Sequence, residues 1–276
     1  MTYTPTLPPG GLAYETQIGG TNTGIPQIVQ SALGRTPGLP TTDFYIGASL
    51  SIDYVDMTSF DFDAYFAYCA QYGLYTIRLS FPWENFQPNL ADVPAADALA
   101  ILGIADTAAS KHGISIILDP IQNAGKRVVN GNTQYVGDGV VTANVFAQSW
   151  LQIAKAVSWY RSIVGYQLMW APTLYGANIT ESTWVTCAQG AITQIRTVDT
   201  TKTILVDGFA ASVAYHWSTT NPDLHTLIDP NNKLIFCARL RLDRDGSGSY
   251  YGWDNEVTAG DSLAIGGTAL DSTWLL

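Results

Sequence analysis

One stretch of sequence decides the fold: a short apolar run followed at once by polar and aromatic residues, Tyr75-Thr76-Ile77-Arg78-Leu79-Ser80-Phe81-Pro82-Trp83-Glu84-Asn85-Phe86-Gln87-Pro88. Its first five residues, 75–79, predict a β-strand. Five more strands are predicted, over 44–48, 115–118, 165–169, 203–206 and 233–238. Successive strands are separated by roughly 30 to 50 residues, the interval that a strand, a helix and two loops require.

Helical periodicity fills the intervals between these strands. Apolar residues spaced by three, four and seven predict helices over 62–71, 95–111, 143–160 and 181–198. Thr180 directly precedes the last helix and is predicted to cap it. Alternation of this kind predicts an α/β fold, a TIM-type (β/α)8 barrel. The alternative is a doubly wound sheet, which a Gly-rich phosphate loop after the first strand would favour, and no such loop is present.

Composition narrows the possible partners. Of the 276 residues, 47% are hydrophobic and 13% are charged, which predicts a folded, soluble protein. A formal net charge of −10 repels a phosphate backbone, so we expect no nucleic-acid partner. No apolar run approaches the ~18 to 20 residues that span a bilayer. The first residues carry neither a basic nor an apolar signal segment, so we expect no signal peptide and no membrane contact, and the localisation stays open.

Metal and cofactor chemistry are not predicted. Cys69, Cys187 and Cys237 lie far apart in apolar surroundings, which favours reduced core residues over a disulfide or a metal knuckle. The three histidines are scattered and show no zinc-site spacing. Residues 243–248 begin like a calcium loop but lack the glutamate that would complete it, so a turn is predicted there. We therefore expect no cofactor and no metal.

The chain divides into two parts. Residues 1–42 are crowded with Pro, Gly and Thr and carry few charges, which predicts an extended N-terminal arm. Residues 43–276 are predicted to form the barrel. The arm is either a loose tail or a segment that orders against other protein subunits.

The segment 75–88 resembles family 5 of the glycoside hydrolases, the cellulase-like barrels, in which an arginine follows the second strand and a Trp-Glu pair opens the next loop. Residues 111–120, 146–150 and 221–248 are similar, in the correct order, to the family's third strand, the helix before its fourth strand, and its sixth strand with the Leu-Asp-x-Asp-Gly-Ser-Gly continuation. The resemblance implies a (β/α)8 barrel that acts on a polysaccharide.

The catalytic residues that the family uses are replaced. A retaining glycosidase needs a protonated carboxyl group and a second carboxylate ~5 to 5.5 Å away. The family's acid/base glutamate lies in an Asn-Glu-Pro motif, and the matching place reads Trp170-Ala171-Pro172. Alanine cannot transfer a proton. No Gly-Glu-Phe-Gly-like turn supplies a nucleophile, and the residues after Ala238 are fewer than two βα units require, so we expect a barrel abridged after its sixth strand.

Charged residues near the predicted strand ends are the remaining candidates. The weak catalytic candidates are Glu84, Asp119 and Glu256. Three polar positions of the family are changed nearby: its third-strand histidine is Ile121, and the histidine and tyrosine of its sixth-strand His-x-Tyr pair are Arg239 and Arg241. Buried arginines need carboxylate partners, which predicts that Asp119 and Asp207 pair with Arg78, Arg239 or Arg241. A relocated pair of catalytic carboxylates is the alternative.

Aromatic residues cluster in the segments that follow strands. Their rings could stack on sugars, and they could equally pack in the core or in an interface. The stacking candidates are Trp83, Trp170, Trp217, Trp253 and Tyr250.

These observations predict a catalytically inactive, glycoside hydrolase-like barrel that serves as a structural or carbohydrate-binding or receptor-binding component of a larger assembly, such as a phage tail or a virion surface. Its partners would be a polysaccharide or surface glycan, and other protein subunits held through the arm. The alternative is an active, divergent glycoside hydrolase that uses Glu84, Asp119 or Glu256 on a polysaccharide. A carboxylate pair facing one open cleft would favour the enzyme.

Overall fold

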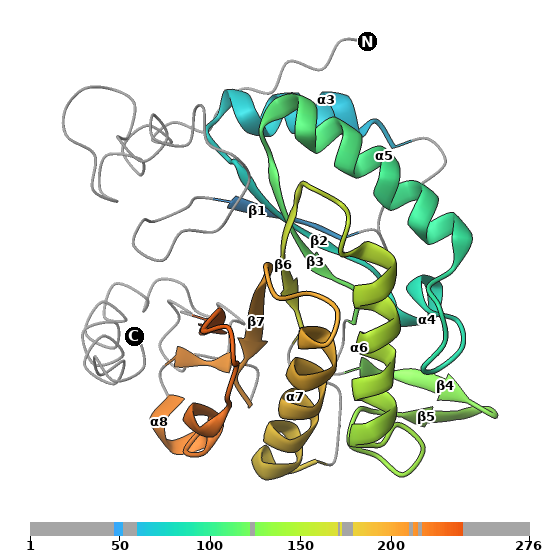
Figure 1. Cartoon of the computed structure of the whole chain (residues 1–276), viewed down its shortest axis with the longest axis vertical. Coiled ribbons are helices and arrows are strands. Elements are labelled where there is room, and N and C mark those ends of the chain that lie inside the picture. Colours follow the sequence, from blue (N-terminus) through green and yellow to red (C-terminus); the bar gives the residue numbers. More distant parts are fainter. Residues whose placement is uncertain are drawn as a thin grey trace, which may run out of the picture.

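The computed structural model describes residues 47–51, 60–121, 125–170, 172, 179–209, 212–214 and 217–239. Within them, six parallel strands form one sheet in the order β1-β2-β3-β6-β7-β8 (Figure 1). The strands are β1 (Gly47–Ser51), β2 (Thr76–Ser80), β3 (Ser115–Asp119), β6 (Ile163–Gln167), β7 (Thr203–Asp207) and β8 (Leu234–Cys237). The spatial order follows the chain without a reversal, as in a TIM-type barrel and unlike a doubly wound sheet. All six predicted strands are confirmed, although residues 44–46 of the first prediction lie outside the described residues.

The helices confirm the predicted alternation. They are α3 (Phe62–Gln71), α4 (Trp83–Phe86), α5 (Ala96–His112), α6 (Ala143–Val157), α7 (Glu181–Arg196) and α8 (Trp217–Thr220), with a 3-10 turn η6 (Leu224–Thr226). Thr180 caps α7 as expected, because its side chain accepts a hydrogen bond from the backbone N–H of Thr183. α3 packs against α5 and α6 against α7 on the outside of the sheet (Figure 1).

Strand register brings polar side chains to one edge of the sheet. β1, β2 and β3 pair in step, so that Ser51 lies opposite Ser80, and Ser80 opposite Asp119. These residues are the last of their strands, at the carboxyl ends, where parallel barrels place their sites. Asp207 and Gln167 end β7 and β6 at the same edge.

A β-hairpin follows β3 that the sequence analysis did not predict. β4 (Arg127–Val129) and β5 (Asn132–Gln134) pair antiparallel. Asn130 and Gly131 connect them with φ angles of 51° and 78°. Positive φ at both central residues is the geometry of a type I′ turn, which Asn-Gly favours. The Asn130-Gly131 dipeptide was therefore the sequence feature from which the hairpin could have been predicted.

The core lies between the sheet and the outer helices. It contains large aromatic side chains from β6, α6 and α7, among them Tyr166, Trp150 and Trp184. Cys69 and Cys187 are buried and form no disulfide with another described residue, as predicted. Cys237 is only partly buried, so it is not the core residue that we expected. In the described part of the chain, no helix combines the length and the apolarity needed to cross a bilayer.

Three predictions fall on residues that are not described. The N-terminal arm of residues 1–42, the division at 42/43 and the abridged end of the barrel after residue 239 all lie there. They stay predictions.

Candidate functional site

Two buried aspartates and two arginines face one another at the carboxyl edge of the sheet. In the first pair, Arg78 Nη1 of β2 lies 3.4 Å from Asp119 Oδ2 of β3. Ser80 Oγ donates a hydrogen bond of 2.8 Å to the same oxygen. Ser49 Oγ accepts from Arg78 Nε at 3.2 Å. Asp119 is completely buried, while the Arg78 side chain stays 26% exposed. The guanidinium is therefore shared between a buried carboxylate and solvent.

The second pair lies across the neighbouring strands. Arg239, just after β8, donates from Nη2 to Oδ2 of the fully buried Asp207. Gln167 Nε2 donates to Asp207 Oδ1 at 2.6 Å. The predicted pairing of Asp119 and Asp207 with Arg78 and Arg239 is confirmed, whereas Arg241 lies outside the described residues. The sequence analysis missed Gln167, and its place at a strand end was the signal that pointed to it.

The neighbours of Asp119 offset only part of the cost of burying its negative charge. Burial raises its pKa to about 7, and the negative charge of Asp207 adds to the shift. The positive charge of Arg78, the hydrogen bond from Ser80 and the charge of Arg239 lower it only in part. Its Oδ1 atom is buried and has no hydrogen-bond partner among the described residues. A buried carboxylate oxygen without a donor costs free energy.

Trp170 lies between the two arginines. The centre of its ring is 5.9 Å from Arg78 Cζ and 4.8 Å from Arg239 Cζ, both cation–π distances. Its backbone N–H donates to the carbonyl of Ile121 at 3.1 Å, which fixes the chain just after β6. The ring is partly exposed. Of the predicted stacking residues, Trp170 is the one that the structure places beside the charged pairs.

Two other predicted stacking residues are core residues. Trp83 opens α4 and is 2% exposed, because the Arg127 guanidinium lies 4.7 Å above its ring. Its indole N–H donates to Gln87 Oε1 at 2.8 Å. Trp217 is 1% exposed and fills the space beside Gly208, where a Cβ would lie 2.4 Å from the ring. Neither ring offers a face to a sugar in this conformation.

Glu84 holds the hairpin in place. The side chain is exposed on α4, and its Oε1 accepts a hydrogen bond from the backbone N–H of Val128 in β4. Arg127 beside it donates to the carbonyl oxygens of Gln87 and Pro88. The structure thus gives the Glu84 carboxylate a positioning role, which follows from the hairpin that the sequence analysis did not predict.

The remaining candidates lie outside the described residues. They are Ala171, Tyr250, Trp253 and Glu256. Among the residues that are described, no three His, Cys, Asp or Glu side chains gather as a metal ion would require.

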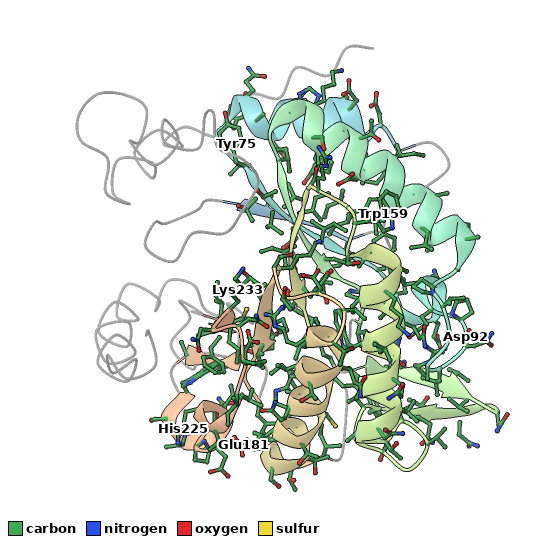
Figure 2. The ribbon with its side chains drawn as sticks, in the orientation of Figure 1. Tyr75, Asp92, Trp159, Glu181, His225 and Lys233 are labelled. Carbon is green, nitrogen blue, oxygen red and sulfur yellow. The ribbon has the colours of Figure 1, made fainter. Side chains whose placement is uncertain are left out.

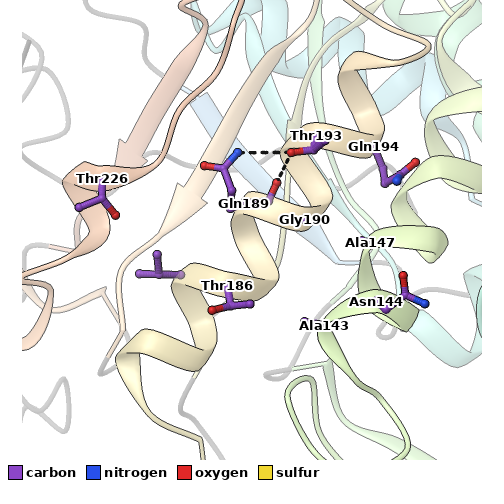
Figure 3. A pocket seen from close by; sticks show the side chains of 10 residues that line it. Ala143, Asn144, Ala147, Thr186, Gln189, Gly190, Thr193, Gln194 and Thr226 are labelled. Atoms are coloured by element: carbon purple, nitrogen blue, oxygen red, sulfur yellow. Dashed lines mark hydrogen bonds between the residues drawn. The ribbon is translucent and has the colours of Figure 1, made fainter.

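A pocket of about 530 Å³ lies apart from the charged pairs, between α6 and α7 (Figure 3). Asn144, Gln189 and Gln194 line it together with small and hydroxyl side chains. Gln189 is engaged by the backbone of Ile228 through both its amide atoms. The lining carries no ionisable group and so provides no acid or base.

Comparison with known proteins assigns the barrel to a family. The family model described as cellulase, glycosyl hydrolase family 5, matches residues 42–238. The chain belongs to glycosyl hydrolase family 5. The resemblance predicted from the sequence is therefore confirmed. Family 5 membership also accounts for the parallel sheet and for a polar cluster at its carboxyl edge.

Curated relatives of this family 5 chain are fungal endoglucanases. The manganese dependent endoglucanase Eg5A of Phanerodontia chrysosporium is 26% identical over 253 residues, which are 90% of this chain and 58% of the relative. Endoglucanase 3 of Humicola insolens is 28% identical over 183 residues, 64% of this chain and 42% of the relative. The chain thus spans about half the length of the curated relatives that it matches.

Solved structures of similar fold are also endoglucanases. The Pseudomonas stutzeri endoglucanase Cel5A in complex with cellobiose has 29% sequence identity and a TM-score of 0.60, covering 80% of this chain and 60% of that one. XacCel5A in complex with cellopentaose has 25% identity and a TM-score of 0.61, covering 81% and 75%. Both structures hold β-glucan fragments in a barrel like this one.

Proposed function

We propose that this family 5 chain binds a β-1,4-linked glucan at the carboxyl edge of its sheet, with the Trp170 ring against a sugar. The observation that carries the proposal is the grouping of the partly exposed Trp170 ring with two partly exposed arginines at that edge. The indole supplies an apolar face, and the guanidinium groups supply donors for sugar hydroxyls. Relatives solved with cellobiose and cellopentaose support a glucan as the ligand class.

We propose further that binding is not followed by hydrolysis through the family's two glutamates. Ala171 stands where the acid/base residue is expected, and it has no proton to transfer. The two described carboxylates at this edge, Asp119 and Asp207, are each held by an arginine. A guanidinium keeps its partner carboxylate ionised, but it also occupies that carboxylate in an ion pair, so Asp119 and Asp207 are held as structural partners of the arginines, which supports binding without cleavage.

A second candidate function is hydrolysis of the same glucan by Asp119. Kinship with endoglucanases favours it, and so does the pKa of about 7, because a carboxyl group that stays protonated near neutral pH can act as a general acid. Release of reducing ends from carboxymethylcellulose by the wild-type chain, abolished in Asp119→Asn, would support this candidate. No release from either protein would exclude it.

Affinity electrophoresis through gels that contain hydroxyethylcellulose tests the binding proposal. We expect the wild-type chain to be retarded, Trp170→Ala to lose about tenfold in affinity, and Trp170→Phe to keep most of it, because phenylalanine retains an aromatic face. Equal mobility of all three proteins with and without the polymer would contradict the proposal. Circular dichroism of each variant checks that the fold is kept.

A role in a larger assembly stays a prediction, because residues 1–42, on which it rests, lie outside the described residues. Light scattering on the full chain tests it. A stable monomer would count against protein partners that are further copies of the chain.

A further inference from the structure

A second aromatic surface lies at the opposite end of β6. Trp159 follows α6 in the turn that leads into β6, and 67% of its surface is exposed (Figure 2). Among the large hydrophobic side chains that the structure describes as exposed, only Ile228, at 70%, exceeds it. Covering this indole with a ligand would remove apolar area from water, which is favourable.

The Trp159 ring is fixed in place. Its N–H donates to the carbonyl oxygen of Ala156 at 2.8 Å, so the only polar atom of the side chain is already satisfied. One face stacks on Tyr160, with the ring centres 3.9 Å apart and the planes 26° from parallel. The side-chain entropy that a ligand would otherwise have to remove is therefore already lost.

Tyr160 is the support beneath the indole. It is 5% exposed, and its hydroxyl donates to the carbonyl oxygen of Leu99 in α5 at 3.0 Å. Gly103, one turn further along α5, lies next to the Tyr160 hydroxyl. The pair is thus anchored to a neighbouring helix and presents a single open aromatic face.

We propose that Trp159, backed by Tyr160, is a second carbohydrate-binding platform on which one pyranose ring of a glucan chain stacks. The inference rests on the proposed function in that the ligand is the same polymer. The apolar face of a pyranose fits a flat, electron-rich ring whose N–H needs no partner. The exposed side chains next to it in sequence, Lys155 and Arg161, are donors for sugar hydroxyls.

The neighbours favour a sugar over a protein surface. Interface cores are depleted in lysine, and the exposed Lys155 lies one helical turn before Trp159. A single rigid ring, with exposed cationic side chains near it in sequence, suits one sugar unit. Trp159 precedes β6 and Trp170 follows it, so the platform and the carboxyl-edge site lie at opposite ends of that strand and cannot contact the same ring.

Binding to insoluble cellulose tests the platform, with four proteins compared: wild type, Trp159→Ala, Trp159→Phe and Trp170→Ala. We expect Trp159→Ala to bind the polymer about fivefold to tenfold more weakly, and Trp159→Phe to stay within about twofold of wild type. The urea midpoint of Trp159→Ala should match that of the wild type, because the side chain is mostly in water. Soluble hydroxyethylcellulose should also protect the exposed indole from acrylamide quenching, and this protection should be smaller in Trp159→Phe.

The outcomes separate the platform from the site at the carboxyl edge. If Trp159→Ala binds cellulose like the wild type while Trp170→Ala is weakened, the platform is wrong and the proposed function stands. If only Trp159→Ala is weakened, the platform stands and the carboxyl-edge site is wrong. A wild-type chain that binds no cellulose overturns both.

Discussion

The loops that precede β7 and β8 bury a charged network in which each group has a partner, whereas the carboxyl end of β3, at the other edge of the sheet, leaves an oxygen of Asp119 without a partner among the described residues. At the amino end, Arg196 Nε and Nη2 donate to both oxygens of Asp229 at 2.7 and 2.8 Å. Arg196 Nη1 donates to the carbonyl oxygens of Asp199 and Lys202. At the carboxyl end, Asp119 has one arginine and one serine, and its Oδ1 has no partner within the described part of the chain.

The pKa values of the two ends move in opposite directions. Burial raises the pKa of Asp199, but hydrogen bonds from Tyr166, Thr201 and Lys202 outweigh it and hold the pKa at about 2. For Asp119 burial prevails, and the pKa rises to about 7. The comparison teaches that the amino end is arranged for stability, while the carboxyl end holds an aspartate whose pKa is raised, as is common at functional sites.

The largest effect should come from breaking the amino-end network. Replacement of Arg196 by Met leaves the Asp229 carboxylate buried without its cation, so we expect a loss of about 3 to 5 kcal/mol in unfolding free energy, measured in urea. The matched control is Arg161→Ala, an exposed arginine, which should change stability by less than about 0.5 kcal/mol. A loss below about 1 kcal/mol in Arg196→Met would show that this network is not a stabilising one.

The next effect should appear as pH dependence at the carboxyl end. The folded-state pKa of Asp119 lies above the ordinary 3.8, so the native state holds its proton more tightly and loses stability as pH rises from about 4 to about 7. Asp119→Asn cannot titrate. Relative to wild type, it should gain on the order of a few kcal/mol between pH 4 and pH 8. If the unfolding free energies of the two proteins change in parallel with pH, the pKa of Asp119 is not raised in the folded state.

A smaller effect tests a single hydrogen bond of the amino-end network. Tyr166→Phe removes the hydroxyl that donates to Asp199 Oδ2 at 2.7 Å, a buried bond to a charged group that is worth about 1.5 to 3 kcal/mol. The contribution of Asp199 to stability is present above its ordinary pKa and is lost as pH falls toward about 2. Tyr160→Phe, which removes a bond to a neutral carbonyl, is the control and should cost about 1 kcal/mol. Equal losses of unfolding free energy in the two variants would show that the hydrogen bond to the charged Asp199 is worth no more than the one to a neutral carbonyl.

The smallest effect concerns Glu84. Glu84→Gln keeps an oxygen that can accept from the Val128 N–H, so stability should change by less than about 1 kcal/mol and glucan binding should not change. Urea unfolding and affinity electrophoresis measure both. A loss of glucan hydrolysis in this variant would return Glu84 to the catalytic candidates.

The sequence predicted the elements because their periodicity is local. Strand and helix patterns placed β3 and α3 to within one residue, and Thr180 was recognisable as a cap. That Asp119 and Asp207 would pair with arginines was predicted because buried arginines need carboxylate partners, and the structure identifies the partner of Asp119 as Arg78.

Burial of individual aromatic residues could not be predicted in this way. Trp83 and Trp170 both follow strands, yet Trp83 lies beneath Arg127 of the hairpin and Trp170 stays open between two arginines. The difference depends on contacts between segments far apart in sequence, such as the hydrogen bond from Arg127 to the carbonyl oxygen of Gln87, 40 residues before it. The missing partner of Asp119 Oδ1 likewise depends on packing from several strands.

The most direct test of the account is to saturate the chain with cellopentaose, measure the heat of binding, and then recover the sugar and determine its length. The account predicts saturable binding, weakened in Trp170→Ala, with the cellopentaose recovered intact. Shorter sugars produced by the wild-type chain and not by Asp119→Asn would contradict it, and would make the carboxyl edge of the sheet an active site.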